Sequence, residues 1–173
     1  MIKRNPAKEK TKKEKTMPTN RVYIICFLIP FFLIACDNNR VYDEYIPIKN
    51  QKWDKDVHAI FRVSIHDTIN PHNIFINVRN AANYKFANLF LFITVSSPNG
   101  NSVTDTFNCV LADEKGKWYG NGYGDLYDNR ILYKSNVFFP DTGTYIFDIV
   151  QAMREDVLEN ISDVGIRIER KTK

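Results

Sequence analysis

The sequence predicts a mainly β fold: an antiparallel β-sandwich, jelly-roll-like, with one short helix before the last strand. Three observations support this prediction. Apolar residues alternate with polar ones in several segments, turn sequences recur at short intervals, and a single segment has helical spacing. A strand turns successive side chains to opposite faces, so short alternating segments separated by turns are typical of a sandwich whose sheets share one core.

The predicted strands follow from alternation with a period of two. Apolar residues occupy every second position in residues 61–66, 74–79 and 145–150, which indicates half-buried strands. The segment Leu89–Val95, LFLFITV, is apolar throughout, so we expect a central strand covered on both faces. Val164–Glu169 is the predicted closing strand.

Turn sequences separate these segments. Ser96–Asn101 contains Asn-Gly, which favours the positive φ of a tight hairpin. Asp113–Gly116 and Pro140–Gly143 carry the same kind of signal. One segment departs from the period of two: in residues 151–161, Met153, Val157, Leu158 and Ile161 have the spacing of a helical face. This spacing predicts the short helix before the closing strand.

Charge separates the first 35 residues from the rest. The chain has 173 residues with 24 basic and 20 acidic side chains, and residues 1–35 hold eight of the basic ones and two of the acidic ones. The remaining 138 residues therefore carry a formal charge of −2. Nucleic-acid binding is not expected, because it needs a basic face on the folded domain.

The leader has the three parts of a secretory signal. A basic tract precedes the uncharged run from Val22 to Ala35, which is short for a membrane-spanning helix, and the run ends in Leu33-Ile34-Ala35-Cys36. This ending resembles the bacterial lipobox, so Cys36 is the predicted lipidation site, and acyl chains there would hold the protein on a membrane. The alternative is an uncleaved anchor. Met17 is a possible true start.

The resulting domain prediction has three parts: a lipoprotein signal peptide over residues 1–35, a lipidated tether over 36–52, and the β-sandwich over 53–173. After Cys36 the only cysteine is Cys109, so the domain has no internal disulfide. Cys109 lies in an apolar run and is predicted to be a small buried side chain.

No metal site is predicted. His58, His66 and His72 are close in sequence, but their spacings of eight and six residues match no common zinc pattern, and we expect strand-exposed or loop histidines. No catalytic set is found either, and no cofactor is expected. Asp125 and Asp128 are near each other, but nothing in the sequence separates their pKa values as an acid and base pair requires.

The most unusual stretch is WYGNGYGDLYD, residues 118–128, which combines glycines, aromatic rings and two aspartates. Its rings would stack on sugars and its carboxylates would suit a hard cation. The alternative is a glycine-rich connection whose rings fold back over the edge of the sandwich. The candidate partner- or ligand-binding residues are Trp118, Tyr119, Tyr123, Asp125, Tyr127 and Asp128.

The order of several short strings resembles the GldH family of gliding-motility lipoproteins from the Bacteroidetes. The strings are YDEY at Tyr42, NVRN at Asn77, NLFLF at Asn88, GYGDLYD at Gly122, FP at Phe139, QAMR at Gln151 and DVGIRIE at Asp163. The resemblance covers nearly the whole chain after Cys36, and none of these strings is a catalytic signature.

This resemblance implies a non-enzymatic envelope lipoprotein, required for gliding and for the associated secretion and adhesin machinery, whose partners are other proteins of that machinery. Cys36 carries over as the acylation site. Surface-exported lipoproteins of this phylum often carry an acidic run just after the lipidated cysteine. Here Asp37 is followed by Asn38, Asn39 and Arg40, so we expect the protein to sit on the outer membrane and to face the periplasm. The alternative function is a carbohydrate- or peptidoglycan-binding sandwich, because one scaffold hosts many functions.

Overall fold

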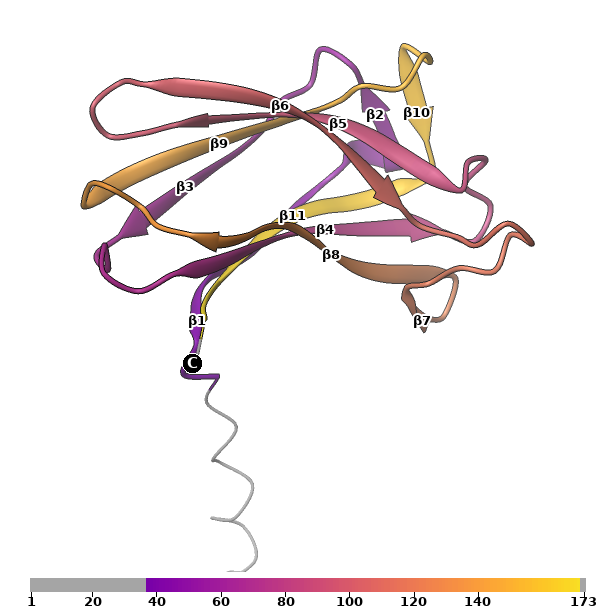
Figure 1. Cartoon of the computed structure of the whole chain (residues 1–173). Helices are drawn as coiled ribbons and strands as arrows, with labels where there is room; N and C mark the ends of the chain where they lie inside the picture. The colour runs from indigo at the N-terminus through magenta and orange to yellow at the C-terminus, as the bar shows by residue number, and fades with distance from the viewer. Residues whose placement is uncertain (1–36, 172–173) are drawn as a thin grey trace, which may run out of the picture. The chain divides into compact units, whose positions relative to one another are not determined.

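The computed structural model describes residues 37–171, and the predicted signal peptide and Cys36 lie outside this range. Within it, antiparallel strands form three sheets (Figure 1). The five-stranded sheet has the order β1 (Arg40–Pro47), β11 (Ile161–Arg170), β4 (His72–Ala81), β8 (Leu126–Val137), β7 (Asn121–Tyr123). The four-stranded sheet has the order β3 (Ala59–Ile65), β9 (Gly143–Gln151), β5 (Asn88–Ser96), β6 (Ser102–Val110).

A small third sheet pairs β2 (Lys52–Asp54) with β10 (Val157–Glu159), and a 3₁₀ turn, η2 (Lys49–Gln51), precedes β2. The predicted mainly β, antiparallel sandwich is confirmed. No helix in residues 37–171 is both long and apolar enough to cross a membrane.

The core lies between the two larger sheets, and the predicted alternation places it correctly. Phe61, Val63 and Ile65 of β3 are buried, and their neighbours in the strand face outward. The same pattern holds for the predicted inward residues of β4 and β9, which are Ile74, Ile76, Val78, Tyr145, Phe147 and Ile149. Trp53 and Leu158 of the small sheet are also buried against this core.

The prediction of a strand covered on both faces is wrong for Leu89–Val95. In β5, Leu89, Leu91 and Ile93 point into the core, but Phe90 and Phe92 remain 39% and 45% exposed. The four-stranded sheet has a core on one face only, so an apolar residue at an outward position stays at the surface. Continuous apolar sequence does not reveal how many faces are covered.

The predicted short helix is also wrong. Residues 153–156 form bends, and residues 157–159 form β10, which pairs with β2. Gln151 competes with helical hydrogen bonds, because its side chain accepts from the backbone N–H of Met153 and donates to the carbonyl of Glu155. Leu158 is buried opposite Trp53, while Val157, on the supposed helical face, is 40% exposed.

The predicted tether over residues 36–52 is wrong for residues 40–52. Arg40–Pro47 form β1, which pairs with β11 from Arg40↔Glu169 to Pro47↔Asp163. Ile48, which follows, is buried. The polar composition of this stretch reflects an edge strand whose outward side chains bind charged neighbours, as described below.

The sandwich has two distinct ends. At one end, called the terminal end, the backbone of Asn39 accepts from Arg170 and that of Pro71 accepts from Lys171. Figure 1 shows the end of β11 beside the start of β1. At the other end, called the hairpin end, β7 and β8 form a hairpin around Gly124 and Asp125. The strands β4 and β8 run between the two ends, and ten residues of β4 span about 30 Å.

Candidate functional site

The segment 118–128 divides into a packed part and an exposed part. Trp118 is half-buried against the core, with its ring centroid 6.3 Å from that of Tyr84 and 5.8 Å from that of Tyr127. These tilted rings form an aromatic layer at the base of the hairpin. Trp118 and Tyr127 therefore have a packing role in this structure.

At two positions of the segment the local geometry requires glycine. A Cβ on Gly120 would lie 2.8 Å from the side-chain oxygen of the buried Asn129. The amide nitrogen of Asn129 donates to the side-chain oxygen of Asn80 and to the carbonyl of Val78. Gly124 has a φ of +61°, in the left-handed region that glycine adopts without strain. The two glycines allow a tight hairpin over a buried amide pair.

The tip of the hairpin faces solvent. Tyr123 is 87% exposed and Tyr119 is 65% exposed, and Asp125 in the turn is also exposed. The backbone carbonyl of Asp125 accepts from the N–H of Ala82, which fixes the turn against the end of β4. The tip thus presents the Tyr123 ring on an anchored backbone, whereas Tyr119 precedes β7 near the base of the hairpin.

Asp128 connects the hairpin to the outer face of the five-stranded sheet. The hydroxyl of Tyr45 donates to Asp128 Oδ1 at 3.0 Å, and Arg79 Nε donates to Asp128 Oδ2 at 3.3 Å. The guanidinium carbon of Arg79 lies 3.9 Å from the centre of the Tyr45 ring, a cation–π distance. Burial, together with the negative charge of Asp128, raises the pKa of Tyr45 to about 12, so its hydroxyl stays a donor.

A second ionic group continues along the same face. The guanidinium of Arg167, a buried side chain, forms ion pairs with Asp43 and with Glu169. The amide of Asn77, which has no exposed surface, donates to Asp43 at 3.4 Å. Together, Asp43, Tyr45, Asn77, Arg79, Asp128, Arg167 and Glu169 form what we call the outer-face network.

This network joins strings of sequence that lie far apart in the chain. Its members come from YDEY, NVRN, GYGDLYD and DVGIRIE, which lie on β1, β4, β8 and β11. Of the network, sequence reasoning had selected only Asp128. Tyr45 and Arg79 were missed, and the signal available was an aromatic and a charged residue at outward positions of strands.

A cleft opens where the network meets the hairpin. It has a volume of about 570 Å³, and its lining residues are Arg79, Asn121, Gly122, Tyr123, Leu126 and Asp128. Asp128 contributes to this cleft and Asp125 does not. The carboxylate of Asp128 is already engaged by Arg79 and Tyr45.

The histidines are dispersed. His58 bonds Asp148 on the outer face of the four-stranded sheet, and His66 is exposed. His72 contradicts the prediction of exposed histidines: it is fully buried, with its ring against Phe139 at a centroid distance of 5.2 Å. Among residues 37–171, no three or more His, Cys, Asp or Glu side chains come together in a way that could hold a metal ion.

Cys109 is a buried free thiol, as predicted, and burial raises its pKa to about 12. A thiol of this pKa is not a nucleophile at neutral pH.

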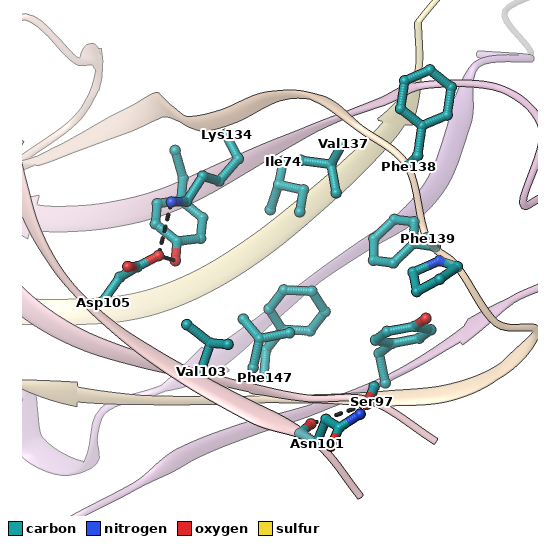
Figure 2. A pocket seen from close by; sticks show the side chains of 14 residues that line it. Ile74, Ser97, Asn101, Val103, Asp105, Lys134, Val137, Phe138, Phe139 and Phe147 are labelled. Carbon is teal, nitrogen blue, oxygen red and sulfur yellow. Dashed lines mark hydrogen bonds and ion pairs between the residues drawn. The ribbon is translucent and has the colours of Figure 1, made fainter. Parts of the chain in front are cut away.

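A second hollow lies near the terminal end, between the edges of the two large sheets. This groove, of about 340 Å³, is lined mainly by apolar side chains, among them Ile74, Val103, Val137, Phe139 and Phe147. Figure 2 shows Phe139 pointing into the groove and Phe138 turned away from it. At one side, Asp105 accepts from Tyr133 at 2.7 Å and pairs with Lys134 at 2.8 Å, which ties β6 to β8.

Comparisons with known proteins agree with one another. The family described as GldH lipoprotein matches residues 40–168, so its match begins with β1 and ends in β11. "Gliding motility lipoprotein GldH homolog" of Christiangramia forsetii is 40% identical over 156 residues, which cover 86% of this chain and 94% of that protein. "Gliding motility lipoprotein GldH" of Flavobacterium johnsoniae is 37% identical, covering 85% and 95%.

Among solved structures, the infectious bursal disease virus VP2 subviral particle is similar at 15% identity, with a TM-score of 0.35 that is too low to carry an argument. The match covers 78% of this chain and 33% of the viral chain. The family match and the two relatives, by contrast, cover most of the described domain. The chain belongs to the GldH lipoprotein family.

Proposed function

We propose that this chain is a lipid-anchored, non-enzymatic component of a gliding-motility apparatus in the bacterial envelope. Acyl chains on Cys36 hold it on the outer membrane, facing the periplasm, and its domain docks on other proteins of the gliding and secretion machinery. Membership of a lipoprotein family and the names of both relatives support the anchor and the link to gliding.

The observation that carries the docking role is the position of the hairpin. The chain leaves the domain toward Cys36 at the terminal end, and the exposed tyrosines stand at the other end, about 30 Å away along β4. Tyrosine is enriched at binding hot spots because its ring buries a large area with few rotatable bonds. The outer-face network holds the hairpin in place, so little conformational freedom is lost on binding.

The anchor is tested first. The experiment uses a bacterial strain that lacks the gene for this chain, or a strain that lacks the gene for the Flavobacterium johnsoniae relative. This strain then expresses either the wild-type chain or the Cys36→Ser variant. Wild type restores gliding and fractionates with membranes, and Cys36→Ser leaves the membrane fraction. Gliding restored by a Cys36→Ser chain that stays on the membrane would contradict the anchor.

Docking is tested with Tyr123→Ala and, as a matched control, Phe92→Ala. Both residues are exposed aromatics, but Phe92 lies on the outer face of the four-stranded sheet. A photo-crosslinking residue at position 123 should capture an envelope protein that is not captured from position 92, and Tyr123→Ala should reduce copurification and gliding.

If the two variants behaved equally, the hairpin would not be the docking site. Binding of peptidoglycan fragments or polysaccharide, measured by calorimetry and lost only in Tyr123→Ala, would instead establish a carbohydrate-binding function.

A further inference from the structure

The three most exposed apolar side chains of the described domain gather at one end of the sandwich. Among its large side chains of purely apolar type, the most exposed are Ile69 at 83%, Val103 at 66% and Phe138 at 59%. All three lie at the terminal end. At the hairpin end the side chains with comparable exposure are Tyr119 and Tyr123, whose hydroxyl groups suit contact with water or with a partner in water.

The loops that hold these residues are tied to one another. Asp67 fixes the loop of Ile69 by accepting from the N–H groups of Ile69 and Asn70, and it pairs with Arg170 at 2.8 Å. His72, which follows this loop, pairs across the sheet with Val137, the residue before Phe138. The loops of Ile69 and Phe138 are therefore neighbours.

Val103 joins the same surface through two contacts. Val103 and Phe138 both border the groove of Figure 2, although the Phe138 ring turns away from it. The β5–β6 hairpin beside Val103 is bound to the loop after Phe138, because the amide of Asn99 donates to Asp141 at 3.1 Å. Ile69, Val103 and Phe138 thus belong to one rigid end of the sandwich.

The lipid is attached close to this end. Cys36 precedes Arg40 by four residues, so the connecting chain spans at most about 14 Å in any conformation. Arg40 is paired with Glu169, next to Arg170 at the terminal end. An acylated Cys36 would thus confine the terminal end to the vicinity of the bilayer.

We infer that the terminal end of the sandwich is a lipid-contact surface, with Ile69, Val103 and Phe138 in the headgroup and upper acyl region of the membrane that holds the anchor. The inference rests on the proposed lipidation of Cys36. Apolar side chains enter this region because it removes them from water, typically to a depth of about 5–10 Å. Contact there orients the domain and directs the hairpin away from the membrane.

Charge does not drive this contact. The described surface of the terminal end carries Arg40, Arg170 and Lys171 and also Asp37, Asp67 and Asp141, so the two signs balance. We therefore expect the orientation to be insensitive to salt, unlike that of a basic membrane-binding patch.

The experiment uses the full-length lipidated protein, reconstituted in vesicles of phosphatidylethanolamine and phosphatidylglycerol. Single cysteines replace Ile69, Phe138 or, as control, Tyr123, and carry a bimane fluorophore. Cys109 is fully buried and does not compete for the label. Lipids with a quencher in the upper acyl chain should reduce fluorescence at positions 69 and 138 and leave position 123 unchanged, at low and high salt.

A further variant probes cooperation between the three residues. In I69S/F138S, a bimane at position 103 should lose its quenching, while the unfolding midpoint stays at the wild-type value because both serines replace exposed side chains. If the labelled single-cysteine proteins float with the vesicles but positions 69 and 138 are unquenched, or no more quenched than position 123, then the lipid-contact surface is refuted and the anchor is not. If the protein does not float, the proposed anchor fails.

Discussion

Gly165 provides a direct test of how β1 is held in the sheet. A Cβ added at this position would lie 2.7 Å from the backbone carbonyl oxygen of Glu44 and 3.0 Å from two ring atoms of Tyr45. Ordinary contact begins at 3.4 Å, so β1 has to move by about 0.7 Å at its centre. Gly165→Ala therefore pushes the edge strand away from β11.

The cost follows from what the movement breaks. About two ladder hydrogen bonds near the Tyr45↔Gly165 pair are weakened, and so is the bond from Tyr45 to Asp128; each contributes about 1 kcal/mol. Alanine recovers about 0.5–1 kcal/mol relative to glycine in a strand. We expect a net destabilisation of about 2 kcal/mol, which lowers the melting temperature by roughly 6 °C for a domain of this size.

The assay is chemical and thermal unfolding of the protein, with Gly122→Ala as matched control. Gly122 also lies in a strand, but the nearest atom to its added Cβ is 3.6 Å away, so alanine there should change stability by less than about 0.5 kcal/mol. If Gly165→Ala were as stable as Gly122→Ala, then β1 would not be packed against β11 as described.

Three further predictions follow from burial. Trp118→Ala removes the ring between Tyr84 and Tyr127 and should cost about 2 kcal/mol in urea unfolding, whereas exposed Tyr119→Ala should be nearly neutral; equal effects would contradict the packing role. Burial lowers the pKa of His72, so the unfolded chain takes up a proton near pH 6.5 that the folded domain does not. Stability should therefore fall as the pH is lowered from 7 to 5, by at most about 1.4 kcal/mol per pH unit, with a flatter dependence in His72→Phe but not in His66→Asn. Cys109, with its raised pKa of about 12, should react with a thiol reagent only after unfolding, and rapid labelling of the native protein would show that its burial is wrong.

The errors in secondary structure share one cause. The apolar spacing from Met153 to Ile161 is compatible with a helix, but Leu158 is buried opposite Trp53 on a strand about a hundred residues earlier in the chain. Pairing with a distant strand, together with the local bonds of Gln151, decides against the helix. For the same reason the polar stretch 40–47 is a strand, because β11 supplies its partner.

The candidate site was predictable only in part. A glycine- and aromatic-rich segment is visible in the sequence because local composition marks a turn, and Tyr123 and Asp128 of that segment line the cleft. Arg79 and Tyr45 bond Asp128 from 49 and 83 residues away. Their role depends on the strand register, which no local pattern contains.

Alone, the sequence determined the β class, the inward face of β3, β4 and β9, and the turns, and it predicts lipidation at Cys36. These features are local, since a period of two, a glycine or a short string acts within a few residues. Only the tertiary structure decided which strands pair, where His72 lies, and how the outer-face network forms. It also placed the most exposed apolar side chains at the end from which the chain leads to Cys36, because strand direction and register, which arise from long-range packing, assign each loop to an end.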